Sequence, residues 1–269
     1  MRLCTAPGIR VSALGSRPRT EVGRMAEQIE PSGAVARTDR QRNFILATIP
    51  DPEYAQLHDA LTPVELTSRD PIYSTGGAIH DVYFPVTAVL SMIAEVDGEP
   101  AVEVATIGRE GMSGLPVFLG VGASPNTVFA QVPGRALRLP VERLRDVLSR
   151  DGHLHRQLHR YIQATLVQLA QNVACNRMHN SEQRAARWLM MTADRVDAER
   201  FPLTQEFLAQ MLGVRRATVS LTAGALQEAG LISYSRGVIT IRDRAGLEAT
   251  SCECYRVVRE EFDQLMRQT

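Results

Sequence analysis

Residues 211–220, MLGVRRATVS, set a glycine between two apolar-periodic segments and follow it with two arginines that have no acid nearby. Upstream, Thr204 offers a hydroxyl that can cap a helix, and Glu206 falls in the positive first turn of that helix. Ala209 allows two helices to approach closely, and Gly213 supplies the turn between them. The apolar residues expected on the inner face are Leu208, Leu212, Val214 and Val219. This spacing predicts a helix-turn-helix.

The next segment, LISYSRGVITIRD at residues 231–243, predicts two short strands joined at Ser235-Arg236-Gly237. A hairpin directly behind a helix-turn-helix forms a wing, and winged helix-turn-helix units bind DNA. The alternative is an ordinary helical hairpin whose arginines are only solvated. Turn, small and apolar positions agree with one another here, which favours the DNA-binding interpretation.

The predicted second helix begins at the two arginines, and this is the end that a recognition helix points at base edges and phosphates. Guanidinium groups there can bind guanine or backbone oxygens. Residues 203–244 carry five arginines against three acids, so the basic excess belongs to one face. The predicted DNA-contacting residues are Arg215, Arg216, Thr218, Ser220, Leu221 and Arg236.

Whole-chain composition excludes several classes of protein. The 269 residues are 44% apolar, which is enough to bury a hydrophobic core. The formal net charge is zero and does not by itself indicate a nucleic-acid or membrane partner. No apolar run approaches the ~18 residues of a membrane span, and no charged-then-apolar leader begins the chain. The four cysteines are too few for a disulfide scaffold. We expect a soluble, cytoplasmic protein without a membrane partner.

Upstream of the helix-turn-helix, two further regions are predicted. Residues 1–42 hold eight arginines against four acids and no sustained apolar period, which is typical of a disordered tail. Residues 43–150 then turn to strands: Val82 and Phe84 are followed by apolar positions at a spacing of two, with Asp97-Gly98 as a hairpin turn. Turns recur about every ten residues, which predicts an antiparallel barrel or jelly roll.

From residue 151 to residue 180 the apolar period lengthens to that of a helix. One stripe is formed by Leu158, Ile162, Leu169 and Val173. The stripe either packs on its own β domain or forms a two-chain coiled coil, and we predict a dimer interface because Thr165 and Asn176 interrupt the stripe as register-fixing polar residues do. Ser181 is expected to cap the next helix. The predicted winged domain spans residues 181–250, and residues 251–269 form a helical extension.

This arrangement resembles the Crp/Fnr family of bacterial transcription regulators over roughly residues 44–244. The resemblance is strongest in LTQEFLAQMLGVRRATVSLTAGALQEAGLI, residues 203–232. It implies an α+β fold: a cyclic-nucleotide-binding-like antiparallel β jelly roll, a long dimerisation helix and a C-terminal winged helix-turn-helix. It also implies a homodimer that binds double-stranded DNA and RNA polymerase and is not an enzyme. Arg216 falls on the family's base-reading arginine, whereas Ala217 and Leu221 replace a DNA-contacting glutamate and a second arginine.

The effector pocket departs further from the family pattern. Where cyclic-AMP-binding members have a ribose-holding Gly-Glu-Leu turn, this chain has Ser113-Gly114-Leu115, and Asn126-Thr127 replaces the phosphate-holding Arg-Ser pair. Without that guanidinium the phosphodiester loses a charge-assisted contact, so we predict that cyclic AMP does not bind tightly. These residues leave open an unidentified small-molecule effector of different chemistry. Arg109 is either part of a rearranged anion site or a solvated loop arginine.

Metal and redox chemistry have weaker signals. Cys4 stands alone in the N-terminal tail, which does not supply the thiolates of an iron–sulfur cluster. Cys252-Glu253-Cys254 is either a redox or metal-responsive switch or ordinary packing, and His155 and His159 are either two zinc ligands or a solvated helix start. We predict no cofactor. The alternatives to a DNA-binding regulator are a switch through Cys252 and Cys254, or a protein–protein adaptor that has lost DNA binding.

Overall fold

The computed structural model describes residues 37–95 and 101–267. The predicted Asp97-Gly98 turn and residues 1–36 of the predicted tail lie outside these ranges. Residues 37–42 depart from the tail prediction, since they form helix α1 (Arg37–Arg42). The reason is Asp39, which is buried and accepts a hydrogen bond of 3.2 Å from the Arg135 guanidinium in the β domain.

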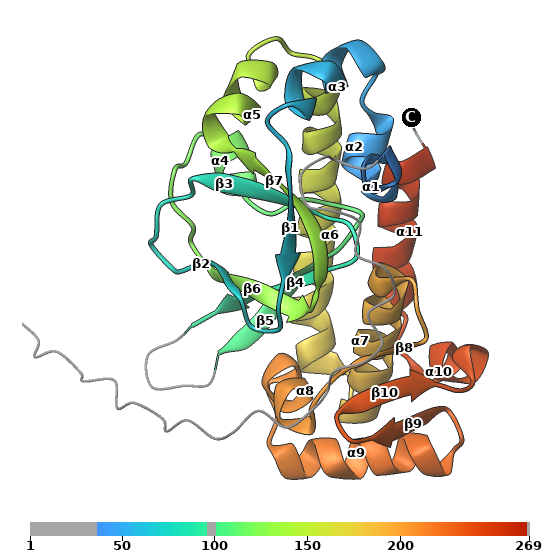
Figure 1. The fold of residues 1–269 in the computed structure, drawn as a ribbon. Coiled ribbons are helices and arrows are strands. Elements are labelled where there is room, and N and C mark those ends of the chain that lie inside the picture. Colours follow the sequence, from blue (N-terminus) through green and yellow to red (C-terminus); the bar gives the residue numbers. More distant parts are fainter. Residues whose placement is uncertain (1–36, 96–100, 268–269) are drawn as a thin grey trace, which may run out of the picture. The chain divides into compact units, whose positions relative to one another are not determined.

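Two antiparallel sheets form the β domain, as the spacing of two along the sequence predicts (Figure 1). One sheet has the order β1 (Thr62–Leu66), β7 (Gly134–Pro140), β3 (Asp81–Pro85). The other has the order β2 (Pro71–Tyr73), β6 (Thr127–Val132), β4 (Val89–Ala94), β5 (Val102–Ile107). Alternate side chains fill the space between them, among them the fully buried Phe84, Leu90 and Leu137. The chain passes from β6 in one sheet to β7 in the other at Pro133-Gly134.

Short helices surround the β domain: α2 (Phe44–Thr48), α3 (Asp51–His58), α4 (Leu115–Phe118) and α5 (Val141–Leu148). Asn43 ties the first of these to the sheets. Its side chain caps α2 by accepting from the backbone of Leu46, and its amide donates to the carbonyls of Pro85 and Gly111 at 2.9 Å each. A buried amide with every hydrogen bond made fixes how the chain enters the domain.

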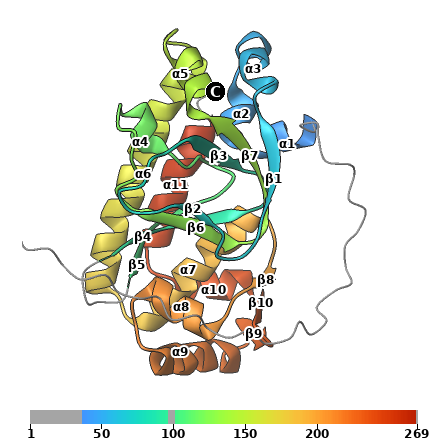
Figure 2. The same ribbon diagram turned by 60° about the vertical axis from the view of Figure 1, so that its left-hand side comes forward.

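Helix α6 (His153–Met178) runs from the β domain to the C-terminal helices (Figure 2). The Glu53 side chain, although remote in sequence, caps the N-terminus of α6. Its carboxylate accepts hydrogen bonds from the backbone nitrogens of His153 and Leu154 at 2.9 and 2.8 Å. Strand β5 and helices α2, α5 and α11 (Cys254–Arg267) pack against α6. Several sides of α6 are therefore buried inside one protomer. No helix in the described ranges is both long and apolar enough to cross a bilayer.

The C-terminal part consists of α7 (Ser181–Val196), β8 (Arg200–Pro202), α8 (Gln205–Leu212), α9 (Arg216–Glu228), β9 (Ile232–Ser235), β10 (Val238–Ile241) and α10 (Arg244–Thr250). Two details differ from the sequence predictions. Asn180 rather than Ser181 caps α7, in a capping box with Gln183. Residues 200–202 add a third strand, β8, to the two predicted wing strands, because Phe201 is buried and pairs with Ile239.

Two buried polar contacts join the β domain to α7. The Glu103 carboxyl of β5 accepts from Trp188 Nε1 at 2.7 Å and from Ser91 Oγ at 2.6 Å. Burial raises the pKa of Glu103, and these hydrogen bonds oppose the shift. In the second contact, Arg195 Nε donates to Glu110 Oε1 at 2.8 Å, and both side chains are buried. These contacts connect the two parts through specific, desolvated groups.

Candidate nucleic-acid interface

The helix-turn-helix forms from the local signals that predict it. Thr204 caps α8 by accepting from the backbone nitrogen of Phe207 at 3.1 Å. Gly213 ends α8 with φ +60°, a left-handed conformation that glycine adopts without strain. The backbone nitrogen of Val214 then donates to Ala209 at 3.0 Å, which closes the turn. Thr204, Gly213 and the two helices are confirmed as predicted.

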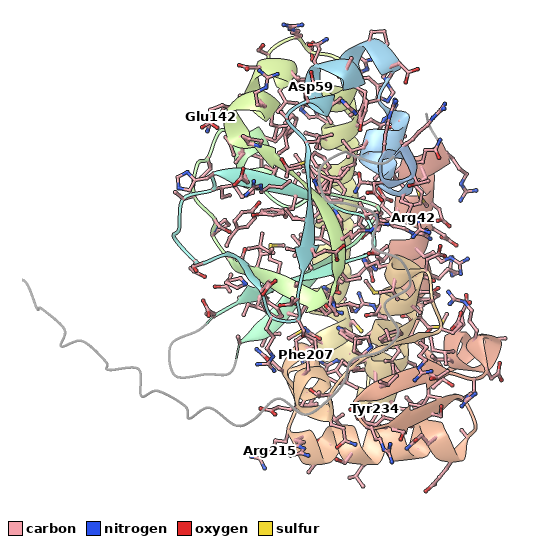
Figure 3. All side chains as sticks on the ribbon, in the orientation of Figure 1. Arg42, Asp59, Glu142, Phe207, Arg215 and Tyr234 are labelled. Atoms are coloured by element: carbon pink, nitrogen blue, oxygen red, sulfur yellow. The ribbon has the colours of Figure 1, made fainter. Side chains whose placement is uncertain are left out.

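Arg215 and Arg216 stand at the N-terminal end of α9, and both are exposed. In the described part of the chain, neither guanidinium lies within ion-pair distance of an acid. Figure 3 shows Arg215 projecting away from the helices, at the edge where α8 and α9 meet. The two guanidinium groups and the first backbone nitrogens of α9 therefore offer unpaired donors at a positive helix end.

Helix α9 has one buried and one exposed face. Val219, Thr222, Ala223 and Leu226 are buried against the rest of the domain. On the other face Leu221 is 78% exposed, and Ser220 donates to Gln205 of α8 at 2.9 Å. Thr218 is half-buried. The predicted contact residues Arg216, Ser220 and Leu221 thus lie on the solvent side of one helix.

The wing is a two-residue hairpin. Arg236 and Gly237 both have positive φ, +51° and +75°, and Ser235 pairs with Val238 across them. Arg236 is exposed at this tip. Tyr234 fixes the wing to the helix-turn-helix because its hydroxyl donates to the Leu203 carbonyl at 2.9 Å. Arg236 and the start of α9 consequently belong to one rigidly connected unit.

The pocket at the predicted effector site is a small cavity of about 50 Å³ that lies between β-domain strands and α6. Ser113, Gly114 and Leu115 line it as predicted for the turn that holds the ligand. Its polar groups already have partners: Ser113 hydrogen-bonds with Tyr73 at 3.0 Å, and Tyr161 donates to the Met112 carbonyl at 3.2 Å. Burial raises the pKa of both tyrosines, so both phenols are neutral. Among the described residues that line this pocket, none is charged.

Tyr161 lines the pocket, and Gly111 makes room for its ring. A Cβ atom at position 111 would lie 2.2 Å from the tyrosine ring. This overlap explains why glycine is needed there although its backbone conformation is not unusual.

Asn126 and Thr127 do not line the pocket, which departs from the prediction. Asn126 donates to the Ile93 carbonyl at 3.3 Å, and Thr127 donates to the Glu95 carboxylate at 3.0 Å. Both side chains are taken up by bonds between strands. Arg109 also lies elsewhere, in an ion pair of 3.1 Å with Asp197, so it supplies no anion site in the pocket.

The predicted dimer stripe needs one correction. Leu158 is fully buried inside the protomer, in which β5, α2, α5 and α11 already pack against α6. Ile162 and Leu169 are half-buried and Val173 is 73% exposed. Leu166, which the prediction omitted, is 55% exposed between them. We define the α6 stripe as Ile162, Leu166, Leu169 and Val173, whose spacing of four, three and four is that of a coiled-coil seam.

The histidine and cysteine predictions have different outcomes. His155 and His159 make edge-to-face contacts with Phe118, with ring centroids 5.2 and 4.9 Å away. Cys252 and Cys254, in contrast, meet two residues that the sequence prediction missed, Cys175 and His179. The signal that could have revealed them is the i, i+4 spacing of a cysteine and a histidine on one helix. The hydrogen bond with Cys252 lowers the pKa of the Cys175 thiol to about 5.

Comparison with known proteins gives one sequence match and many structural ones. Residues 183–250 match the Crp-like helix-turn-helix domain. No curated protein matches the chain. FixK2 of Bradyrhizobium japonicum is 16% identical, with a TM-score of 0.60 over 71% of this chain and 98% of that one.

Two further solved structures are similar. The c-di-GMP-responsive regulator CLP of Xanthomonas campestris is 16% identical, with a TM-score of 0.57 over 71% of this chain and 99% of its own. A CRP/FNR-family transcriptional regulator of Thermus thermophilus is 19% identical, with a TM-score of 0.55 over 70% of this chain and 97% of its own. At these identities the likeness is one of fold: a β domain, a long helix and a C-terminal helix-turn-helix.

Proposed function

We propose, from the premise that this chain is a Crp/Fnr-type transcription regulator with a helix-turn-helix DNA-binding domain, that it binds a specific DNA sequence as a homodimer without cyclic AMP. The observation that carries the proposal is the pair of exposed, unpaired guanidinium groups of Arg215 and Arg216 at the start of α9. The protein would act in the cytoplasm, and its further partner would be RNA polymerase at a promoter.

Direct reading of bases is assigned to Arg216, and phosphate contact to Arg236 of the wing. A bidentate arginine–guanine pair discriminates by about 1–3 kcal/mol, whereas a phosphate contact carries no sequence information. Leu221 presents an apolar group where related proteins carry arginine, and an apolar side chain suits the methyl group of thymine. The preferred sequence should therefore differ from the usual family operator.

Replacing Arg216 with alanine should cost about 1–3 kcal/mol of binding free energy and relax the preference at one position of each half-site. Selection of bound fragments from a random DNA pool, with the wild type and the variant side by side, measures this. Arg236→Ala is the matched control, since it should weaken binding evenly and leave the selected motif unchanged. An unaltered motif for Arg216→Ala would refute the base-reading assignment.

DNA affinity should not respond to cyclic nucleotides. A ligand shifts a conformational equilibrium only through different contacts with the two states, and this uncharged pocket offers the cyclic phosphate no cation. We expect operator titrations with and without millimolar cyclic AMP or cyclic GMP to coincide. A tenfold gain in affinity, worth about 1.4 kcal/mol, would contradict this prediction. An uncharged, mainly apolar effector fits the lining better.

The salt dependence of DNA binding distinguishes a DNA-binding regulator from the alternative, a protein–protein adaptor that does not bind DNA. A protein that neutralises phosphates releases counterions, so the logarithm of its affinity falls linearly with the logarithm of salt concentration. An adaptor without DNA binding shows no such slope.

A further inference from the structure

We propose that Cys175, His179, Cys252 and Cys254 form a tetrahedral zinc site that fastens the start of α11 to the junction of α6 and α7. This inference goes beyond DNA binding. It takes up the metal interpretation of Cys252 and Cys254 but gives them two partners from a different part of the chain.

The spacing of the four ligand atoms fits one small ion. Each residue offers one ligand atom, and these atoms all lie within 4.8 Å of one another. Cys175 Sγ lies 3.5 Å from Cys252 Sγ, and Cys254 Sγ lies 3.7 Å from His179 Nδ1. Zinc bonds of ~2.3 Å to sulfur and ~2.0–2.1 Å to nitrogen put tetrahedral ligand atoms about 3.5–3.8 Å apart. The two short separations already match these values, and pairs up to 4.8 Å apart would have to close by about 1 Å when the ion binds.

The surroundings are those of a closed, structural site. All three thiols are buried, and only 14% of the His179 side chain is exposed. His179 Nε2 lies 3.3 Å from the Glu253 carboxylate, which orients the ring so that Nδ1 faces the sulfur atoms. A carboxylate behind a ligating histidine is the usual support of a zinc ligand. Four protein ligands leave no open coordination position.

The donor set favours zinc over other thiolate chemistry. In a four-iron cluster each thiolate binds its own iron, which needs ligands further apart than this group of atoms. A disulfide between Cys175 and Cys252 would leave Cys254 and His179 without a function. Three cysteines and one histidine are a common structural zinc set. Arg184 and Arg187 of α7 interact electrostatically with Cys175 and can balance the surplus negative charge.

The position of the site determines what it does. Cys175 lies in the last turns of α6, and His179 is the residue at which the backbone leaves that helix, with ψ 148°. Cys252 lies between α10 and α11, and Cys254 is the first residue of α11. Zinc would therefore hold the end of the α6 stripe, the start of the DNA-binding domain and the root of α11 together. Losing the ion should loosen the junction that sets the recognition helix.

Metal content tests the proposal directly. The tag-free full chain, produced in zinc-supplemented medium under reducing conditions, should contain about one zinc ion per chain by elemental analysis. Cys175→Ser and Cys252→Ser should each reduce this to less than about a tenth. Cys4→Ser is the matched control, since Cys4 is not one of the four proposed ligands, and it should keep the full content.

Two further measurements keep the test decisive if the serine variants fail to fold. His179→Cys preserves a ligand and should retain the ion, whereas Glu253→Gln should lower zinc affinity about 10–100-fold with the fold intact. Cobalt(II) added to protein stripped with chelator should give the intense visible absorption of a tetrahedral thiolate complex. Wild-type protein that holds no zinc and develops no such spectrum would overturn the proposal. So would mass spectrometry showing Cys175 joined to Cys252 under reducing conditions.

Discussion

Glutamate at both Leu166 and Val173 is expected to produce a folded monomer whose DNA affinity is lower by on the order of a hundredfold or more. The two side chains are 55% and 73% exposed in a single protomer, so their replacement costs that protomer little. Across the seam of two parallel helices they would be buried, and four carboxylates would face one another. A monomer contacts only one half-site and loses the effective concentration that links the two.

Size measurement by light scattering, together with a DNA titration, checks this outcome. The control variant carries Ala55→Glu and His58→Glu, which add two carboxylates to the exposed side of α3. That protein should remain dimeric and bind DNA normally, at a near-palindromic site whose half-sites lie about 34 Å apart. A tight dimer that survives the double change on α6 would place the interface elsewhere.

Replacing Arg195 with methionine should lower the free energy of unfolding by about 3–5 kcal/mol. Arg195 and Glu110 are 7% and 8% exposed, and the guanidinium is the cation that lies against that carboxylate. Methionine fills much of the space but leaves a buried charge without its partner. Denaturant unfolding followed by the fluorescence of Trp188, the chain's one tryptophan, reports on α7 itself.

Arg109→Met is the matched control for this experiment. Its ion pair with Asp197 lies at the surface, with side chains 27% and 65% exposed, and should contribute less than about 1 kcal/mol. The double variant Glu110→Gln, Arg195→Met should recover part of the loss because no buried charge remains. Equal costs for Arg109→Met and Arg195→Met would contradict the assigned role of the buried pair.

The helix-turn-helix could be predicted from the sequence because its signals are local. A cap at Thr204, a turn at Gly213 and apolar residues three or four apart all act within a few residues of one another. The Leu158 prediction failed for the opposite reason. Apolar periodicity shows that a helix face is buried but not by what, and two of the helices that pack against α6, α2 and α11, lie far from Leu158 in sequence.

The i, i+4 spacing of Cys175 and His179 could be read from the sequence, but their meeting with Cys252 and Cys254 could not, for a similar reason. Cys175 and Cys252 are separated by 77 positions, and no local pattern indicates that α11 returns to α6. The residues that line the pocket could be predicted from the sequence only in part. Ser113, Gly114 and Leu115 could be placed by their turn, whereas the inward or outward direction of Asn126 depends on strand register.

A Cβ atom at position 111 would overlap the ring of Tyr161, and this overlap limits which mutations can adapt the pocket to a new ligand. A side chain at position 111 fits only after Tyr161 has been replaced by a smaller residue, so the replacement of Tyr161 has to precede that of Gly111. The size of the pocket therefore depends on a residue of α6, Tyr161. Tyr161 itself lines the pocket, so a smaller residue at position 161 would enlarge the pocket and make room for a side chain at position 111 in the same step.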